Sequence, residues 1–273
     1  MDKAKLHKLE KQAKEIRKSI LVSLAEAGSG HTGGSMGMAD VFTALYFEIM
    51  NHDPKNPLWP ERDRLVLSIG HIAPLLYSTL AHAGYFDEEE LKTLRKLGSR
   101  LQGHPGKNHG LPGIELSAGS LGQGLSVAVG MALAAKHKHE NHRIFCVSGD
   151  GELQEGSIWE AAMSAAHHHL NNLIWIIDRN NLQIDGHTEE VMKLEPLDGK
   201  FSAFGWEVFQ CNGNNIEEVI FAINATTKVK DAPSVIIAKT IMGKGIAEIE
   251  NQAAWHGKVP SKEQLSRFME ELR

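Results

Sequence analysis

Two short apolar runs separated by a helical segment limit the possible folds of this chain more than any other feature. The runs cover residues 144–147 and 173–177, and between them Ile158, Ala161 and Ala165 are spaced for one helical face. This order is typical of a βαβ unit, in which the two strands are parallel and adjacent and the crossover is right-handed. We therefore expect an α/β fold with a mainly parallel sheet and helices on both faces.

Polar residues follow each run at the point where its strand should end. Gly149, Asp150 and Gly151 follow the first run, and Asn180 follows the second. Strand ends of this kind form the ligand-binding edge of an open α/β sheet. Carboxylate and amide oxygens suit Mg²⁺ or Ca²⁺, and glycines let the backbone approach a phosphate closely. The alternative interpretation is a plain βαβ unit that carries one Gly-Asp turn and one Asn turn.

Composition restricts the class of protein. The 273 residues are 42% hydrophobic and 23% charged, which suits a globular chain with a substantial core, and we expect a single domain over residues 1–273. The net charge of −5 argues against binding to nucleic acid or an anionic membrane, and no apolar run approaches the length of a membrane span. The first residues lack the apolar segment of a signal peptide, and Cys146 and Cys211 lie in expected strands, so we expect a reducing cytoplasm.

The remaining periodicities predict the rest of the fold. We expect helices over residues 3–27, 38–50, 72–83, 88–97, 119–136, 216–227 and 262–272, and strands over 65–68, 206–210 and 235–239. Asp87 and Glu90 predict a capping box for the helix over 88–97. Residues 98–118 and 187–198 are expected to be loops, and His31 is expected on a Gly-rich turn. The histidines near positions 137–142 and 167–169 lack a nearby acid or cysteine that would complete a zinc site.

Several motifs along the chain resemble transketolase, a thiamine-diphosphate enzyme. The turn Gly149-Asp150-Gly151 and the pair Asn180-Asn181 resemble the family's diphosphate motif. Other matches are Ser-Gly-His at 29–31 with Gly-Met-Ala-Asp at 37–40, Arg-Asp-Arg at 62–64 with Gly-His at 70–71, Gly-His-Pro at 103–105 and Trp-His-Gly at 255–257. Thr32 and Ser120 depart from the family, which usually has proline at both positions.

The resemblance implies roles for individual residues. Asp150, Asn180 and the backbone carbonyl of Leu182 are expected to hold Mg²⁺ (or Ca²⁺) on the diphosphate of the cofactor. The histidines expected to contact cofactor or sugar are His31, His71, His104 and His256. The glutamates expected at a dimer interface linked to cofactor activation are Glu155 and Glu160. The residues expected to contact the cofactor are His71, Gly119, Leu121, Gly149, Asp150, Gly151, Asn180 and His256.

The implied activity is transfer of a two-carbon ketol unit from a ketose to an aldose, with free or phosphorylated sugars as substrates. The chain resembles only the first third to half of an ordinary transketolase, so we expect the N-terminal subunit of a split enzyme. Its partner is then a C-terminal subunit, most simply in a heterotetramer with two copies of each. The alternatives are a half of a deoxyxylulose-phosphate-synthase-like or phosphoketolase-like enzyme, or a non-catalytic partner that kept the fold.

Overall fold

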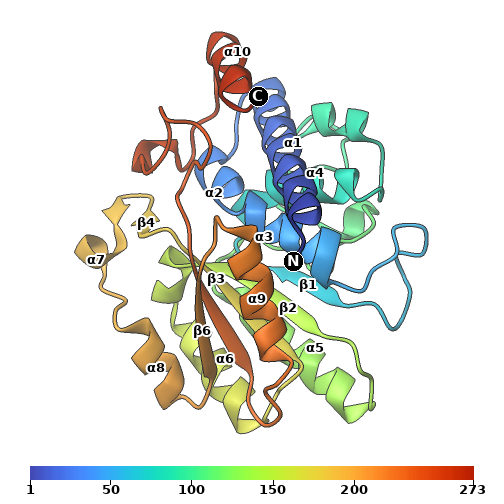
Figure 1. Ribbon diagram of the computed structural model, residues 1–273, viewed down its shortest axis with the longest axis vertical. Helices are drawn as coiled ribbons and strands as arrows, with labels where there is room; N and C mark the ends of the chain where they lie inside the picture. Colours follow the sequence, from blue (N-terminus) through green and yellow to red (C-terminus); the bar gives the residue numbers. More distant parts are fainter.

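A five-stranded parallel sheet lies at the centre of the computed structural model, which describes residues 1–273. The strand order is β1-β2-β3-β7-β6, and every neighbouring pair is parallel (Figure 1). The strands are β1 (Arg64–Leu67), β2 (Ile144–Gly149), β3 (Leu173–Arg179), β6 (Glu207–Asn212) and β7 (Ser234–Lys239). The predicted α/β class with a parallel sheet is therefore confirmed.

The βαβ unit forms as its sequence predicts. Strands β2 and β3 pair in register from Ile144 opposite Leu173 to Gly149 opposite Asp178, and α6 (Gly156–His167) connects them. Both strands are buried along nearly their whole length, which explains their continuous apolar sequences. Because the strands are parallel and end level with each other, Asp150 and Asn180 emerge at the same edge of the sheet.

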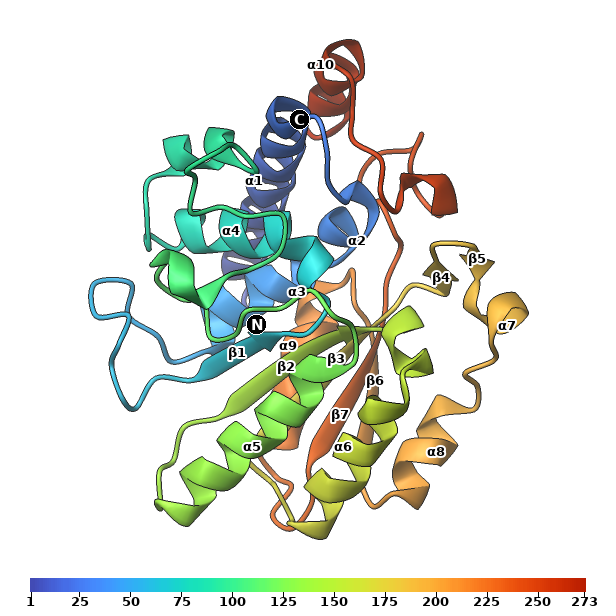
Figure 2. The same cartoon turned by 180° about the vertical axis from the view of Figure 1, so that it is seen from behind.

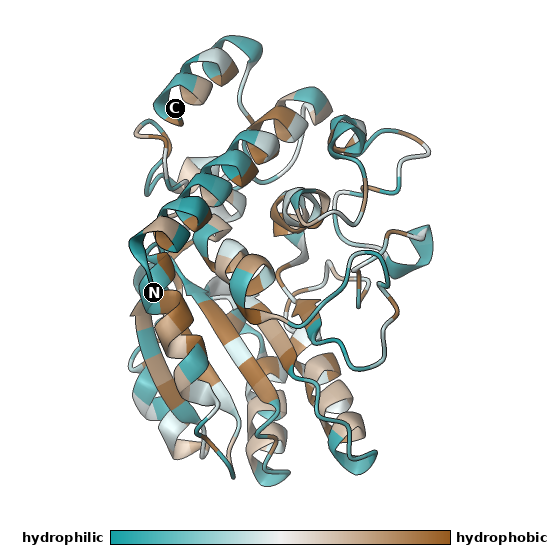
Figure 3. Ribbon diagram, turned by 45° about the vertical axis from the view of Figure 1, so that its right-hand side comes forward, coloured by the Kyte–Doolittle hydropathy of each residue, from teal (hydrophilic) through white to brown (hydrophobic).

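Helices cover both faces of the sheet, as predicted. Successive strand residues point to opposite faces, so Phe145 and Val147 belong to one hydrophobic core and Ile144 and Cys146 to the other. The first core packs under α1 (Lys3–Ala27), α3 (Ala39–Ala44), α4 (Ala73–His82) and α9 (Ile216–Thr226). The second core packs under α5 (Gln123–His137), α6 and α8 (Leu197–Ala203), which lie together in Figure 2. Figure 3 shows the hydrophobic strands between these two layers.

The structure corrects several predicted elements in the first half of the chain. His31 lies at the end of the Gly-rich turn after α1, but the residues that follow it form a short helix, α2 (Thr32–Gly37), of which His31 is the N-cap. The helix predicted over 38–50 starts at Ala39 and ends in a π-helical turn, η1 (Leu45–Ile49). The segment 88–97 forms only a 3₁₀ helix, η3 (Glu88–Thr93), without the predicted capping box: Asp87 accepts from the Glu89 N–H at 2.9 Å.

Segments predicted as loops contain short elements. Residues 182–198 contain a small hairpin of β4 (Leu182–Gln183) and β5 (Gly186–His187). The short helix α7 (Thr188–Val191) and the first residues of α8 follow it. The long loop after η3 contains a 3₁₀ turn, η4 (Lys107–His109). Further 3₁₀ turns are η2 (Gly70–Ile72), η5 (Gly151–Gln154) and η6 (Ala253–Trp255), and the last helix is α10 (Lys262–Glu271). None of the helices combines the length and apolar character that crossing a membrane requires, and both cysteines are buried and free.

The start of α5 packs so closely on the end of β1 that it needs glycine. A Cβ on Gly124 would lie 2.4 Å from the Cβ of Ser68, whereas a Cβ on Gly130, in the same helix, would meet no atom within 4 Å. We expect Gly124→Ala to lower the free energy of unfolding by about 1–3 kcal/mol through overpacking. The matched variant Gly130→Ala should raise it by about 0.5–1 kcal/mol, because alanine loses less backbone entropy in a helix. Urea unfolding of both variants measures the difference, and equal effects would contradict the close packing.

A candidate active site at the C-terminal edge of the sheet

A cleft of about 340 Å³ lies at the C-terminal edge of the sheet and collects most of the predicted site residues. It is lined by strand-end turns and by loops from distant parts of the sequence. The predicted residues that line it are His31, His71, His104, Gly119, Leu121, Gly149, Asp150, Gly151, Glu155, Asn180, Leu182 and His256. Glu160 is exposed on α6 and does not line the cleft, so its expected interface role stays a prediction.

Hard oxygen donors converge at the ends of β2 and β3. The Asp150 carboxylate is almost fully buried and accepts from the backbone N–H groups of Gly151 at 2.8 Å and Asn181 at 2.6 Å. The side-chain oxygen of Asn180 accepts from the Leu182 N–H at 2.9 Å, which turns the chain back over the strand end. A carboxylate, an amide oxygen and a nearby backbone carbonyl are the kind of donors that Mg²⁺ shares with phosphate oxygens. This donor set therefore fits the expected metal.

The glycines beside Asp150 leave room for a bulky ligand. A Cβ on Gly149 would lie 3.0 Å from Ile69 Cγ2, and one on Gly151 would lie 3.0 Å from Gln183 Cβ. A side chain at either position would crowd the wall of the cleft. The backbone is therefore free to approach a diphosphate, which fits the expected cofactor.

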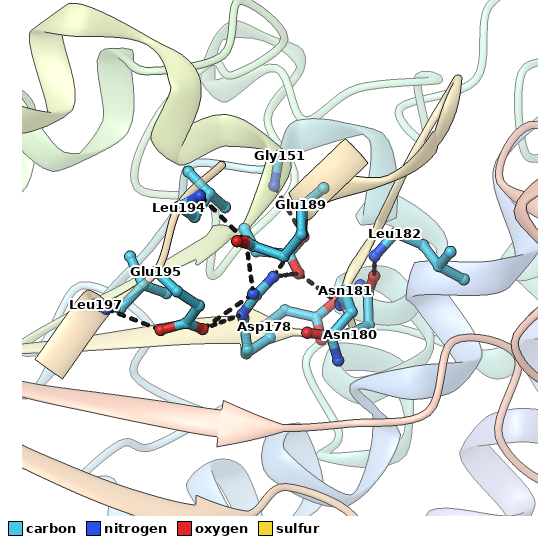
Figure 4. A network of polar contacts seen from close by, with 12 residues as sticks. Gly151, Asp178, Asn180, Asn181, Leu182, Glu189, Leu194, Glu195 and Leu197 are labelled. Carbon is cyan, nitrogen blue, oxygen red and sulfur yellow. Dashed lines mark hydrogen bonds and ion pairs between the residues drawn. The ribbon is translucent and has the colours of Figure 1, made fainter. Parts of the chain in front are cut away.

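Arg179 supports the Asp150 carboxylate from beneath, and sequence reasoning missed it. Its guanidinium is buried and donates to Asp150 Oδ2 at 3.1 Å and to Thr188 Oγ1 at 2.6 Å. It also pairs with Glu189 at 3.1 Å and Glu195 at 3.0 Å, so the segment after the hairpin is tied to the strand end (Figure 4). The signal in the sequence was a basic residue directly before Asn180, but its partners could not be read from spacing.

Burial controls the protonation of the two aspartates at this edge. It raises the pKa of Asp150 to about 6, while the nearby Arg179 opposes the rise. Asp178, which accepts from Asn180 Nδ2 at 2.9 Å and from the Thr240 hydroxyl, has its pKa raised to about 7 by burial and by the charge of Asp150. A cation at this site would favour the ionised forms, so metal binding and proton release are coupled here.

Glu152 is a second residue that sequence reasoning missed. Its buried carboxylate accepts from the Ser68 hydroxyl and from the backbone N–H groups of Gly122 at 2.7 Å and Gly149 at 3.3 Å. Ser68 Oγ in turn accepts from the Gly124 N–H at 3.0 Å. Burial raises the pKa of Glu152, and these hydrogen bonds oppose the rise. Glu152 therefore joins the ends of β1 and β2 to the start of α5.

Four imidazoles form a cluster in the cleft, although they come from four separate loops. The ring centroid of His31 lies 5.0 Å from His71, 5.4 Å from His256 and 6.3 Å from His104, and His71 lies 4.9 Å from His256. The Nδ1 atom of His31 is buried and has no hydrogen-bond partner in the protein. The structure thus brings together the four histidines that the sequence singled out, and it leaves one buried polar atom for a ligand to satisfy.

These imidazoles are neutral near pH 7. Burial and, after it, the neighbouring histidines lower the pKa of His31 to about 4 and that of His71 to about 3. Burial also lowers the pKa of His104 and His256. A neutral imidazole has one nitrogen that donates and one that accepts, so the cluster can both orient hydroxyl or carbonyl oxygens and move a proton.

The histidines at 137–142 and 167–169 lie at the opposite end of the sheet. His137 ends α5 and His167 ends α6, whereas the cleft lies at the first turns of these helices. No group of three or more His, Cys, Asp or Glu side chains in residues 1–273 is placed to hold a metal ion. Any metal in the cleft therefore depends on the Asp150 carboxylate together with oxygen donors from an amide, the backbone and the ligand.

Removing the guanidinium beneath Asp150 should destabilise the fold strongly. We expect Arg179→Met to lower the free energy of unfolding by about 3–5 kcal/mol, because it leaves a buried carboxylate unpaired. The loss should grow as the pH rises, since without Arg179 the folded state holds a proton on Asp150 that the unfolded chain releases. Urea unfolding across pH measures this. Glu195→Gln, a half-exposed partner of the same arginine, is the control and should cost less than about 1 kcal/mol.

The neutral imidazoles predict a loss of stability in acid. The pKa of His71 is about 3 in the folded protein against an ordinary 6.5, so below the ordinary value the unfolded chain binds a proton that the folded chain does not. We expect His71→Asn to flatten the fall in unfolding free energy below pH 6.5 by up to about 1.4 kcal/mol per pH unit. Urea unfolding of the cofactor-free chain tests this. His167→Asn, at an exposed position far from the cleft, should leave the slope unchanged.

Comparisons with known proteins agree with the site. The family model described as the thiamine diphosphate binding domain of transketolase matches residues 9–272. An apulose-4-phosphate transketolase subunit of Actinobacillus succinogenes is 46% identical over 97% of this chain and 96% of its own length. The 6-deoxy-6-sulfo-D-fructose transketolase subunit SqwG of a Clostridium species is also 46% identical, over 97% of this chain and 96% of its own length.

The fold agrees equally well with solved structures. The transketolase of Campylobacter jejuni superimposes with a TM-score of 0.92 at 38% sequence identity, over 100% of this chain and 43% of that one. The chain thus spans less than half the length of that single-chain transketolase, but almost the full length of the two relatives named above. It belongs to the transketolase family and corresponds to that family's thiamine-diphosphate-binding domain.

Proposed function

We propose that this chain is the N-terminal subunit of a two-component transketolase, which moves a two-carbon ketol unit from a ketose to an aldose. The observation that carries the proposal is the single cleft that contains both the oxygen donors at the ends of β2 and β3 and four neutral imidazoles. In this proposal, phosphate and metal are recognised beside groups suited to sugar hydroxyls and carbonyls. The match to relatives of the same length supports the same conclusion.

The residues in the cleft have separate tasks in this proposal. Asp150, Asn180 and the carbonyl of Leu182 hold Mg²⁺ on the diphosphate, and the glycines beside Asp150 admit it. When bound, thiamine diphosphate supplies the reactive carbon for breaking and forming the carbon–carbon bond. His31 and His104 orient the sugar and transfer protons to and from its oxygens, while His71 and His256 lie between sugar and cofactor.

The chain works with a partner in this proposal, most simply as a heterotetramer in the cytoplasm. No phenylalanine, tyrosine or tryptophan lines the cleft, so another chain would supply aromatic contacts to the cofactor ring. Apolar side chains stand exposed beside it: Ile184, which lines the cleft, is 71% exposed and Met192 is 62% exposed. Both relatives of matching length are named as subunits of a transketolase, which agrees with a second component.

The substrates in this proposal carry an anionic terminal group. One relative is named for a sugar phosphate and another for a sulfonated sugar, and both are equally similar to this chain. Phosphate esters and sulfonates share a tetrahedral oxyanion. We therefore propose a ketose donor whose end remote from the carbonyl bears such a group.

The test is to measure ketol transfer by this chain with and without the C-terminal subunit, in thiamine diphosphate and Mg²⁺. We expect turnover only when both chains are present. Asp150→Ala should abolish that turnover and the metal-dependent binding of cofactor measured by calorimetry, because it removes the carboxylate ligand.

His167→Asn is the matched control, since this exposed residue lies far from the cleft, and it should keep full activity. Full turnover by the isolated chain would contradict the two-subunit proposal. Unchanged cofactor affinity in Asp150→Ala would contradict the metal assignment.

A further inference from the structure

The turn over residues 119–124 carries two cleft residues but contains little that could keep it rigid. Gly119 and Leu121 line the cleft, and three of the six residues of the turn are glycines. Gly122 has a left-handed φ of 84° and is the N-cap of α5, so it has no side chain that could cap the first turn of the helix. Ser120 is exposed and stands where the family usually has proline, so the backbone there is not restrained by a ring.

Side chains from other elements supply the missing restraint. Glu152 Oε1 accepts from the Gly122 N–H at 2.7 Å and also from the Ser68 hydroxyl. Ser68 Oγ in turn accepts from the Gly124 N–H at 3.0 Å and thereby caps α5 from outside the helix. Glu152 and Ser68 are each only 1% exposed, so water does not compete for these donors. On the other side of the turn, the Ser157 hydroxyl donates to the Gly122 carbonyl at 3.0 Å.

The same carboxylate also restrains the strand end that carries the expected metal ligand. Its second oxygen accepts from the N–H of Gly149, the residue directly before Asp150, at 3.3 Å. The end of β1 lies against the start of the 119–124 turn, because a Cβ on Gly70 would lie 2.9 Å from the Gly119 backbone nitrogen. One buried side chain therefore sets the spacing between two cleft-lining turns that lie far apart in the sequence.

We propose that Glu152 is a positioning residue for the cofactor, because it fixes the 119–124 turn against the turn Gly149-Asp150-Gly151. It supplies from a distance the rigidity that a proline ring would supply at position 120. The residues that it holds in place are those expected to contact the cofactor, and a ligand that spans two turns binds more tightly when their spacing is fixed in advance. This inference rests on the proposed function, since it concerns the cofactor of the same cleft.

The affinity of the assembled two-subunit protein for thiamine diphosphate, measured by calorimetry in excess Mg²⁺, tests this role. For Glu152→Ala we expect the affinity to fall about ten- to a hundredfold, as is usual when a group that orients a ligand residue is lost. At saturating cofactor kcat should fall much less, because the loss lies in binding. Glu152→Gln keeps one acceptor oxygen for Gly122 and Ser68, and should recover part of the affinity.

A carboxylate at the opposite edge of the sheet provides the matched control. Glu140 lies between α5 and β2, and its side chain is 43% exposed. Glu140→Ala should leave the cofactor affinity unchanged.

Proline at position 120 separates positioning from a general effect on stability. The Ser120 N–H donates to no backbone carbonyl, so Ser120→Pro removes no backbone hydrogen bond. In the wild type, where Glu152 already restrains the turn, this change should alter the cofactor affinity little. In the Glu152→Ala background it should recover most of the lost affinity. An equal effect of proline in both backgrounds would overturn the proposal, because the two positions would then act independently.

Amide hydrogen exchange provides a readout that does not depend on turnover. The Gly122 and Gly124 N–H groups should exchange faster in Glu152→Ala than in the wild type, since both lose their restraint. Unchanged exchange would overturn the proposal, as would faster exchange with unchanged cofactor affinity. If the wild-type assembly bound the cofactor but transferred no ketol unit, the proposed function would fail, and calorimetry would still decide the role of Glu152. If the wild-type assembly bound no cofactor, both would fail.

Discussion

The parallel pairing of β2 with β3 determines where every other part of the site must lie. The two strands end level, and the Asp150 N–H donates to the Asp178 carbonyl at 3.1 Å, so the pairing continues one residue past β2. The Asp150 carboxylate then accepts from the Asn181 N–H across the gap between the strand ends. If the register shifted by one residue, these side chains would point to opposite faces of the sheet. The oxygen donors therefore meet because two buried apolar strands fix their relative position.

The cleft has a distinctive balance of charge. Its acids, Asp150, Asp178 and Glu152, are buried, and burial raises the pKa of each. Its bases are imidazoles that burial keeps neutral. In the absence of a ligand, Arg179 is the cation that directly pairs with this set. A divalent cation bound with a diphosphate would therefore meet buried acids and neutral imidazoles, and Arg179 would be the cation already paired with these acids.

Sequence patterns predicted the elements that periodicity governs. The βαβ unit, helix α1 and the parallel sheet follow from apolar spacing, whereas the four histidines were singled out by the resemblance of their motifs to transketolase. The patterns did not predict the site residues whose role depends on contacts between segments that are distant in the sequence. Arg179 and Glu152 act through partners in other segments of the chain, and spacing along the chain does not encode those contacts. The short helix after His31 was missed because its glycines favour a turn locally, whereas in the fold all of its residues are buried. The individual roles of the site residues stay predictions.

The separation of the two ends of the sheet has a consequence for how such a chain can diverge. The groups that line the cleft come from the strand ends and from the turns and short elements at that edge. The far ends of α5 and α6, with the histidines at 137–139 and 167–169, contribute no residue to the cleft. We expect substitutions of these exposed histidines to leave the register of β2 and β3 and the shape of the cleft unchanged. Changes at that end are accordingly expected to affect the choice of sugar less than changes in the segments that line the cleft at the opposite edge.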